Sequence, residues 1–152
     1  MIKLVVFDLD FTLWNAGGLW CDCTCPPYER KNGYVYDAEQ RKIMLYPDVI
    51  NILSYLKNKN IKIAIASRTE EPEWAKEILD LFDIRHLFDY EEIFPDRKTT
   101  HLKNISQKSG IRYEEMIFFD DEERNIEDVE KLGVKSILLK NGISIDIVQE
   151  NI

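Results

Sequence analysis

The sequence predicts a three-layer α/β fold with a parallel sheet of about five strands and helices on both faces. Short apolar runs alternate along the chain with longer segments of helical period, a pattern typical of parallel strands joined by helices. Polar residues follow several of these runs directly, as they do at the carboxyl ends of strands in open α/β sheets. The length of 152 residues suits one domain, residues 1–152, with a core of its own.

The composition excludes several classes of protein. Hydrophobic residues make up 45% of the chain and charged residues 32%, values typical of a soluble globular protein. The net charge of -8 argues against a general nucleic-acid or anionic-membrane partner. No apolar run approaches the roughly 18 residues of a membrane span, and no cleavable leader is evident. We expect a cytoplasmic location, and the three cysteines, all within residues 21–25, fit a reducing compartment.

The first strand is expected at Leu4–Phe7, a short apolar run suited to a fully buried parallel strand. Asp8, Asp10 and Thr12 follow at alternate positions where this strand should end. Two crowded carboxylates repel each other and are costly to desolvate, so they persist most easily with a cation between them. A polar turn with two solvated aspartates is the simpler alternative.

The segment 15–46 has a different character and predicts a small β-hairpin flap near Asp8. It is rich in Gly, Cys, Pro and Tyr and lacks a helical period. Asn32-Gly33 is a favoured pair for a two-residue type I′ turn, and residues 37–40 suggest a second turn. The arms of the hairpin and a last short strand are expected at residues 28–31, 34–36 and 43–45.

The middle of the chain predicts a helix, a strand and a second helix. Pro47 opens the first helix, and residues 58–60 end it. Residues 61–66 form a second buried strand, which places Ser67 and Arg68 at its carboxyl end. The next helix begins near Pro72. Its expected buried stripe consists of Trp74, Ile78, Leu81 and Phe82.

The second half continues the alternation of strands and helices. An outer strand is expected within residues 87–94, and a helix begins at Lys98 and stops at Gly110. A buried strand then ends in Asp120 and Asp121. The remaining elements are expected at residues 116–119 (strand), 122–132 (helix) and 134–139 (strand), before a final helix capped by Ser144.

The predicted topology brings distant polar residues to one edge of the sheet. Asp8, Ser67 and Asp121 each come after a buried strand, and Lys98 follows a loop on the same side. The clustered carboxylates need counter-charge, which a lysine and an oxygen-preferring cation such as Mg²⁺ can supply. A solvated helix start is the alternative for residues 120–123, although it explains the two aspartates poorly because they follow an apolar strand directly.

This set of residues suits phosphoryl transfer. A cation and a lysine offset the repulsion between an anionic phosphate and an anionic nucleophile. A carboxylate can be phosphorylated and then hydrolysed, which divides one slow reaction into two faster ones. A second carboxyl group nearby can protonate the leaving oxygen and later activate water.

Four segments together resemble the magnesium-dependent phosphatase family of the haloacid dehalogenase (HAD) superfamily. They are DLDFTLW (8–14), ASRT (66–69), KTTH (98–101) and FFDDEERNI (118–126), and they span nearly the whole chain. The resemblance implies a HAD-like (Rossmann-like) fold with a small flap and no large cap domain. It also implies a Mg²⁺-dependent phosphomonoesterase acting on phosphotyrosine-type or sugar-phosphate substrates, and so on a phosphorylated small molecule or a phosphoprotein.

The same resemblance implies a role for each motif residue. Asp8 is the implied nucleophile and a metal ligand, and Asp10 is the general acid/base, with its backbone carbonyl on the metal. Asp121 is the third protein ligand. Thr12 and Asp120 would support the ligands from behind. The implied phosphate-binding and substrate-binding residues are Ser67, Arg68 and Lys98.

Two other functions use similar residues. A phospho-accepting signalling module of the receiver type also clusters aspartates, a hydroxyl residue and a lysine, but it carries its acceptor Asp on a later strand. Asp10, two residues from Asp8, is placed as an acid/base partner instead. A haloacid dehalogenase needs no Mg²⁺, and both Asp10 and the metal site expected at Asp121 count against it.

Some conspicuous residues have two interpretations. Alternate cysteines in 21–25, on an extended flap, could bind a soft metal such as Zn²⁺, or they could be small half-buried residues. His101 is expected on a helix surface or behind the site. Trp14 and Trp20 fit the pocket mouth and flap packing equally well.

Overall fold

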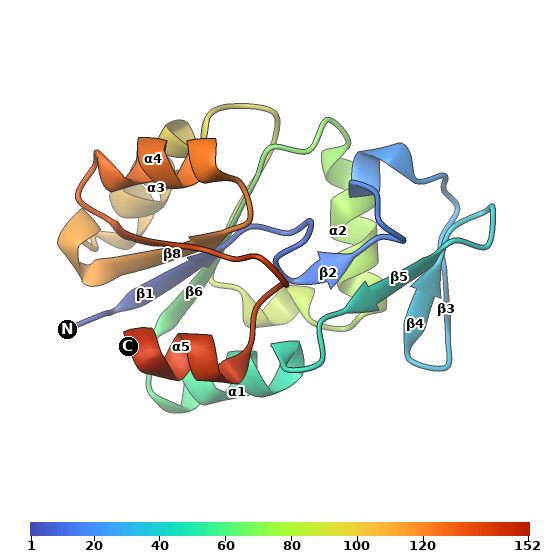
Figure 1. The fold of residues 1–152 in the computed structure, drawn as a ribbon, viewed down its shortest axis with the longest axis horizontal. Helices are drawn as coiled ribbons and strands as arrows, with labels where there is room; N and C mark the ends of the chain where they lie inside the picture. Colours follow the sequence, from blue (N-terminus) through green and yellow to red (C-terminus); the bar gives the residue numbers. More distant parts are fainter.

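The computed structural model describes residues 1–152 and has three layers, with a central sheet between two groups of helices (Figure 1). The sheet contains five parallel strands in the order β7-β6-β1-β8-β9, so the first strand lies at its centre. The predicted α/β class is therefore confirmed. The strands are β1 (Leu4–Phe7), β6 (Lys62–Ser67), β7 (Tyr90–Ile93), β8 (Met116–Asp120) and β9 (Lys135–Leu138).

Five α-helices cover the two faces of this sheet. Three of them share one core with the sheet: α1 (Val49–Asn58), α2 (Pro72–Leu81) and α5 (Ile145–Asn151). The other face is covered by α3 (Lys98–Ser109) and α4 (Glu123–Glu130). Short 3-10 turns are η1 (Cys21–Cys23), η2 (Arg85–Leu87) and η3 (Tyr113–Glu115). None of these helices combines the length and apolar character that crossing a membrane requires.

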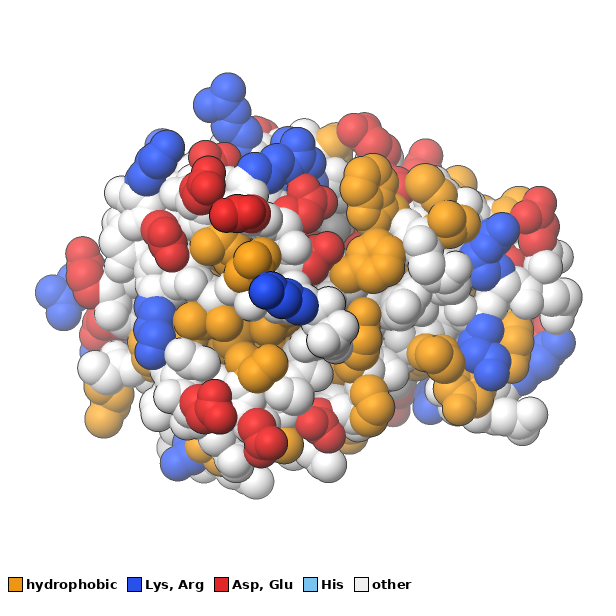
Figure 2. All heavy atoms as spheres, in the orientation of Figure 1, with side chains coloured by type: hydrophobic (Ala, Val, Ile, Leu, Met, Phe, Trp, Pro, Cys, Tyr) orange, Lys and Arg blue, Asp and Glu red, His pale blue; other side chains and the backbone are white.

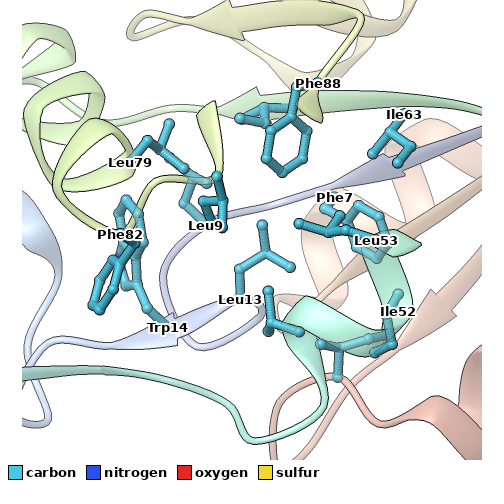
Figure 3. Packing of buried hydrophobic residues seen from close by; sticks show 14 of the residues in the cluster. Phe7, Leu9, Leu13, Trp14, Ile52, Leu53, Ile63, Leu79, Phe82 and Phe88 are labelled. Carbon is cyan, nitrogen blue, oxygen red and sulfur yellow. The ribbon is translucent and has the colours of Figure 1, made fainter. Parts of the chain in front are cut away.

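The apolar runs of the strands are explained by burial on both sides. Val5 and Phe7 belong to one core cluster, whereas Leu4 and Val6 belong to the other. Successive strand residues point to opposite faces, so a strand between two helix layers must be apolar throughout. Figure 3 shows the larger core, in which Phe7 lies among residues from α1, α2 and the flap. The Phe7 and Phe119 rings stack with their centroids 5.6 Å apart.

The flap is a second, antiparallel sheet with the strand order β2-β5-β4-β3. The turn between β3 and β4 has positive φ at Asn32 and Gly33, 52° and 84°, as a type I′ turn requires. The carboxylate of Asp37 holds the next turn by accepting hydrogen bonds from three backbone N–H groups and from Arg41. The flap strands are β2 (Trp14–Asn15), β3 (Glu29–Lys31), β4 (Tyr34–Tyr36) and β5 (Lys42–Leu45).

The hypothesis of a soft-metal site in the flap is wrong. Residues Cys21–Cys23 form a 3-10 turn and not an extended strand, so alternate side chains do not point to one side. Cys21 is buried, Cys23 is exposed and Cys25 is intermediate. The three side chains thus lie in different surroundings, and they do not gather into a group of metal ligands.

The expected stripe of α2 is also partly wrong. Ile78 and Phe82 are buried as predicted, but Trp74 and Leu81 are only partly buried. Ala75 and Leu79 take the inward positions. The inward face of the helix is therefore centred on Ala75, Ile78 and Leu79, and Trp74 packs against the core while only partly buried.

Gly142 shapes the return of the chain toward the flap. Its φ is 75°, and an added Cβ would overlap the ring carbons of Tyr46. The next residue, Ile143, donates its N–H to the carbonyl of Thr12 at 3.0 Å. The glycine therefore allows the segment before α5 to lie directly against the loop that carries the first aspartates.

Replacing Gly142 with alanine is expected to lower the free energy of unfolding by about 2–4 kcal/mol, through left-handed strain plus overpacking against Tyr46. Gly110→Ala is the matched control, since its φ is 72° and nothing lies within 4 Å of its added Cβ. The control should lower the free energy of unfolding by only about 1–2 kcal/mol, from the left-handed conformation alone. Urea unfolding measures the free energy of unfolding of both variants. Equal losses of stability would show that the added Cβ does not clash with Tyr46.

Candidate active site

The carboxyl edge of the parallel sheet carries one pocket with a volume of about 190 Å³. Asp8 follows β1, Ser67 ends β6 and Asp121 follows β8. Lys98 reaches the same edge as the first residue of α3. Six of the eight site residues expected from sequence line this pocket, namely Asp8, Asp10, Ser67, Arg68, Lys98 and Asp121.

The Lys98 ammonium is buried at the floor of the pocket, with 1% of the residue exposed. Its Nζ donates to Asp8 Oδ1 at 2.9 Å and to the Ala66 carbonyl at 2.5 Å, and it lies 3.0 Å from Asp120 Oδ2. Three acceptors thus match its three protons. Burial opposes the charged form, but the two carboxylates outweigh it and raise the pKa of Lys98. The lysine therefore supplies a permanent positive charge.

Asp8 remains short of counter-charge even with Lys98 beside it. Burial, together with Asp120 and Asp121, raises the pKa of Asp8 well above its usual range despite the lysine. The Thr12 hydroxyl donates to Asp8 Oδ2 over a long 3.4 Å. A further cation near Asp8 would favour the ionised carboxylate.

Three carboxylates crowd together at the place where such a cation could bind. Oxygen atoms of Asp8, Asp120 and Asp121 lie within 4.8 Å of one another. Burial raises the pKa of Asp121 to about 6, and the Asp120 charge adds to this. An all-oxygen set of closely spaced carboxylates fits Mg²⁺, which prefers hard oxygen ligands.

Asp10 lies outside this carboxylate cluster and is held from the flap. Its Oδ1 accepts hydrogen bonds from the Trp14 indole at 2.8 Å and from the Cys21 N–H at 2.9 Å. Burial raises the pKa of Asp10 to about 6 even though both hydrogen bonds favour the ionised form. The two donors fix one oxygen of Asp10, and its side chain still lines the pocket. Sequence reasoning missed both donors, because nothing in the flap sequence indicates where it folds back.

Asp120 is occupied by neighbours within the chain. Its Oδ1 accepts from the Glu122 N–H at 2.9 Å, and its Oδ2 accepts from Asn125 Nδ2 at 3.1 Å. The same Oδ2 faces Lys98. Asp120 belongs to the carboxylate cluster by distance, but both of its oxygens already have partners within the chain.

Asn125 is a site residue that sequence reasoning did not identify. Its amide nitrogen bonds Asp120, and its Oδ1 accepts from Arg68 Nη1 at 3.1 Å. It is 2% exposed, on the inward side of α4. The available signal was its spacing of four residues from Val129, which places a polar group on the apolar face of the helix. Asn125 thereby holds the Arg68 guanidinium at the pocket.

Ser67 contributes a hydroxyl group to the pocket. Its Oγ accepts from the Thr69 N–H at 3.3 Å, so its proton can be donated to a bound anion. Thr69 in turn contacts Cys21 Sγ at 3.6 Å, which joins the loop after β6 to the flap.

The two tryptophans have different positions. Trp14 is fully buried and packs in the core, whereas Trp20 is 51% exposed and lines the pocket. Packing is therefore the correct interpretation for Trp14, and the pocket mouth is the correct one for Trp20. Trp20 is the only hydrophobic residue of the lining, so the pocket is otherwise polar.

His101 is buried, so of its two expected positions, on a helix surface or behind the site, the surface position is wrong. Its ring contacts the Phe94 carbonyl through Nε2 at 3.0 Å and meets the Phe94 ring edge-on. Its Nδ1 is buried without a hydrogen-bond partner. The loop before α3 covers this side of the helix, which the helical pattern alone does not reveal.

Comparison with known proteins gives consistent family matches. The family model described as Acid Phosphatase matches residues 1–152. The chain is 43% identical over 152 residues to Magnesium-dependent phosphatase 1 of Homo sapiens, covering 99% of this chain and 85% of the relative. It is 40% identical over 158 residues to a HAD-like hydrolase superfamily protein of Schizosaccharomyces pombe, covering 94% and 90%.

Solved structures share the fold at low sequence identity. A haloacid dehalogenase-like family hydrolase from Streptococcus pneumoniae superposes with a TM-score of 0.67 at 16% identity, covering 99% of this chain and 91% of the other. L-2-haloacid dehalogenase from Xanthobacter autotrophicus superposes with a TM-score of 0.66 at 14% identity, covering 99% and 82%. These likenesses confirm the HAD-like fold.

The buried His101 ring makes stability depend on pH. Burial and the Lys98 charge lower the pKa of His101 from 6.5 to about 4. Between these values the unfolded chain binds a proton that the native protein does not, so stability falls as pH falls through this window. His101→Gln cannot take up the proton. Relative to this variant, the free energy of unfolding of the wild type should fall by about 2–3 kcal/mol between pH 7 and pH 4.

Urea unfolding at a series of pH values tests this expectation. The control is His86→Gln, which changes the other histidine, whose side chain is 63% exposed. The control should follow the wild-type pH dependence. An unchanged pH dependence in His101→Gln would contradict the assignment.

Proposed function

Because the chain belongs to the acid phosphatase family and is a magnesium-dependent phosphatase of the HAD superfamily, we propose that it hydrolyses phosphomonoesters through a phospho-aspartate at Asp8. One observation carries this proposal. Asp8 lies beside Lys98 within the carboxylate cluster, whereas Asp10 is held apart by the Trp14 indole and the Cys21 N–H. Two carboxyl groups in different environments can perform two different functions.

In the first step, an oxygen of Asp8 attacks phosphorus as the bond between phosphorus and the ester oxygen breaks. Asp10 donates a proton to the departing oxygen, which leaves as an alcohol. The pKa of Asp10, about 6 because of burial, allows it to carry this proton near neutral pH. The products of the step are phospho-Asp8 and ionised Asp10.

In the second step, water attacks the phosphorus of phospho-Asp8. The ionised Asp10 takes a proton from that water, so the group that acted as acid now acts as base. The bond between phosphorus and the Asp8 oxygen breaks, which releases inorganic phosphate and restores both carboxyl groups. The flap donors keep Asp10 in one position through both steps.

The remaining residues bind the phosphate group. The Ser67 hydroxyl and the Arg68 guanidinium line the pocket, and Lys98 stands at its floor. Asp8, Asp121 and the backbone carbonyl of Asp10 would hold Mg²⁺, while Thr12 and Asp120 support them from behind. When bound, Mg²⁺ supplies positive charge that offsets the negative charge of the phosphate and the carboxylates.

The pocket suits a phosphotyrosine-type or sugar-phosphate substrate. The structure has no large cap domain, and the small flap 15–46 supplies the exposed Trp20 ring at the pocket. A phosphorylated small molecule or an exposed phosphoryl group on a protein fits such a site. The net charge of -8 makes nucleic acids and anionic membranes unsuitable partners. We also propose that residues 1–152 act as one domain in the cytoplasm, whose reducing conditions suit the three free cysteines.

Hydrolysis of p-nitrophenyl phosphate tests the nucleophile and the metal together. Wild type should be active with Mg²⁺ and inactive with EDTA. Asp8→Asn should lose at least about a thousandfold in kcat, because the attacking oxygen is missing. Asp22→Asn, which removes another carboxylate of the pocket lining, is the control and should stay active. Near-normal activity of Asp8→Asn would refute the mechanism, and a long-lived adduct from acetyl phosphate without turnover would indicate a signalling module.

Asp10→Asn should separate the two steps. Because p-nitrophenolate leaves without needing a proton, phosphorylation of Asp8 should persist, whereas hydrolysis of phospho-Asp8 should slow by about 10²–10⁴. Rapid mixing should then show a burst of one nitrophenolate per enzyme molecule, with phospho-Asp8 visible by mass spectrometry. The double variant Asp8→Asn/Asp10→Asn should abolish the burst. Turnover without any burst or adduct would count against Asp10 as the base.

A further inference from the structure

A second hollow, of about 550 Å³, lies beside the active-site pocket over α3 and α4. We call it the basic groove. Arg68 and Arg124 line both hollows, so the two adjoin. The residues of the basic groove are Arg68, Arg97, Thr99, Lys103, Arg124, Asp128, Lys131 and Leu132.

The charge of the basic groove is opposite to that of the whole chain. The chain has a net charge of -8, yet the groove has five cationic side chains and one acidic side chain, Asp128. Arg124 pairs with Glu122 at 2.8 Å, and the other four cations make no ion pair. Arg68 bonds only the neutral amide of Asn125. Figure 2 shows Lys and Arg side chains along the top of the molecule above α4.

Such a group of unpaired cations favours an anion. Like charges gathered on one surface repel one another, and a bound anion relieves the repulsion. By comparison, Arg41 and Arg85 elsewhere on the surface pair with Asp37 and Glu91. The groove thus leaves its positive charge available to a ligand.

The positions of the cations suit a phosphate group. Thr99 and Lys103 are four residues apart on α3, as are Arg124 and Asp128 on α4, so each pair shares a helix face. Arg97 precedes the first residue of α3, where the helix dipole adds positive potential. Arginine guanidinium groups match the geometry of phosphate oxygens by paired hydrogen bonds.

We propose that the basic groove binds the second phosphate group of a small-molecule bisphosphate whose reacting phosphate lies against Asp8. Arg68 and Arg124 stand between the two phosphate positions, since they line both hollows. The inference rests on the proposed function and narrows its sugar-phosphate class to sugars that carry two phosphates. Arg97, Lys103 and Lys131 are then specificity-determining residues and take no part in bond breaking.

Calorimetric binding to Asp8→Asn in the presence of Mg²⁺ tests the inference without turnover. The probes are a hexose monophosphate and the corresponding hexose bisphosphate. The bisphosphate should bind more tightly. Adding Lys103→Gln/Lys131→Gln should weaken the affinity for the bisphosphate by about fivefold to tenfold. The affinity for the monophosphate should stay almost unchanged. The salt dependence of bisphosphate binding should fall as well.

The matched control is Lys59→Gln/Lys135→Gln in the same background. These two lysines are exposed, make no ion pair and lie at the amino ends of β6 and β9, at the opposite edge of the sheet. The control should leave the preference for the bisphosphate intact. Equal affinities for the two probes, or equal losses in the two double variants, would overturn the inference.

Two further arms separate the possible failures. The first arm uses a peptide with one phosphate and acidic neighbouring residues. If this peptide binds more tightly than the bisphosphate, and if Lys103→Gln/Lys131→Gln removes that advantage, the small-molecule assignment is overturned. Hydrolysis of the hexose monophosphate by the wild type is measured in parallel. If the wild type hydrolyses the monophosphate but the bisphosphate does not bind more tightly, only the role of the basic groove is overturned. If no monoester is hydrolysed, the proposed function is overturned.

Discussion

The buried ion cluster around Lys98 is the interaction on which the active-site edge depends. Its ammonium lies within 3.0 Å of both Asp8 and Asp120 and also bonds the Ala66 carbonyl. Removing one partner of a buried ion pair leaves an uncompensated charge, which is strongly destabilising. The cluster therefore joins the ends of β1, β6 and β8 to the first residue of α3. The position of that helix sets the position of every cation it carries.

Positive charge is distributed over this edge in three places with different roles. Lys98 compensates the two carboxylates of the floor, and the carboxylate cluster leaves room for a divalent cation. Arg68, held by Asn125, stands where the pocket meets the basic groove. The chain as a whole is acidic, and the cations of this edge therefore stand out against the rest of its charge.

Most of the fold and the centre of the site could be predicted because both depend on strand ends. A buried parallel strand must be apolar, so polar residues such as Asp8 and Ser67 mark where it stops, and all such ends meet at one edge. The partners of Asn125, and the Trp14 indole and Cys21 N–H that bond Asp10, could not be predicted. These contacts are set by how a helix rotates and where the flap returns. The errors at Trp74 and His101 share this cause, since periodicity does not show which neighbour covers a helix face.

The contact between the flap and Asp10 has a consequence for how such a protein can change over time. The Cys21 N–H that holds Asp10 belongs to the same short turn that follows Trp20 at the pocket entrance. A substitution or insertion that widens the entrance by moving this turn also releases the Asp10 carboxyl group, which we propose carries the proton. New substrates of greater bulk are therefore gained at the expense of turnover, whereas the exposed residues of α3 and α4, such as Lys103 and Arg124, can vary without moving this turn. Diversification of selectivity is expected on the helical side of the pocket, away from the flap.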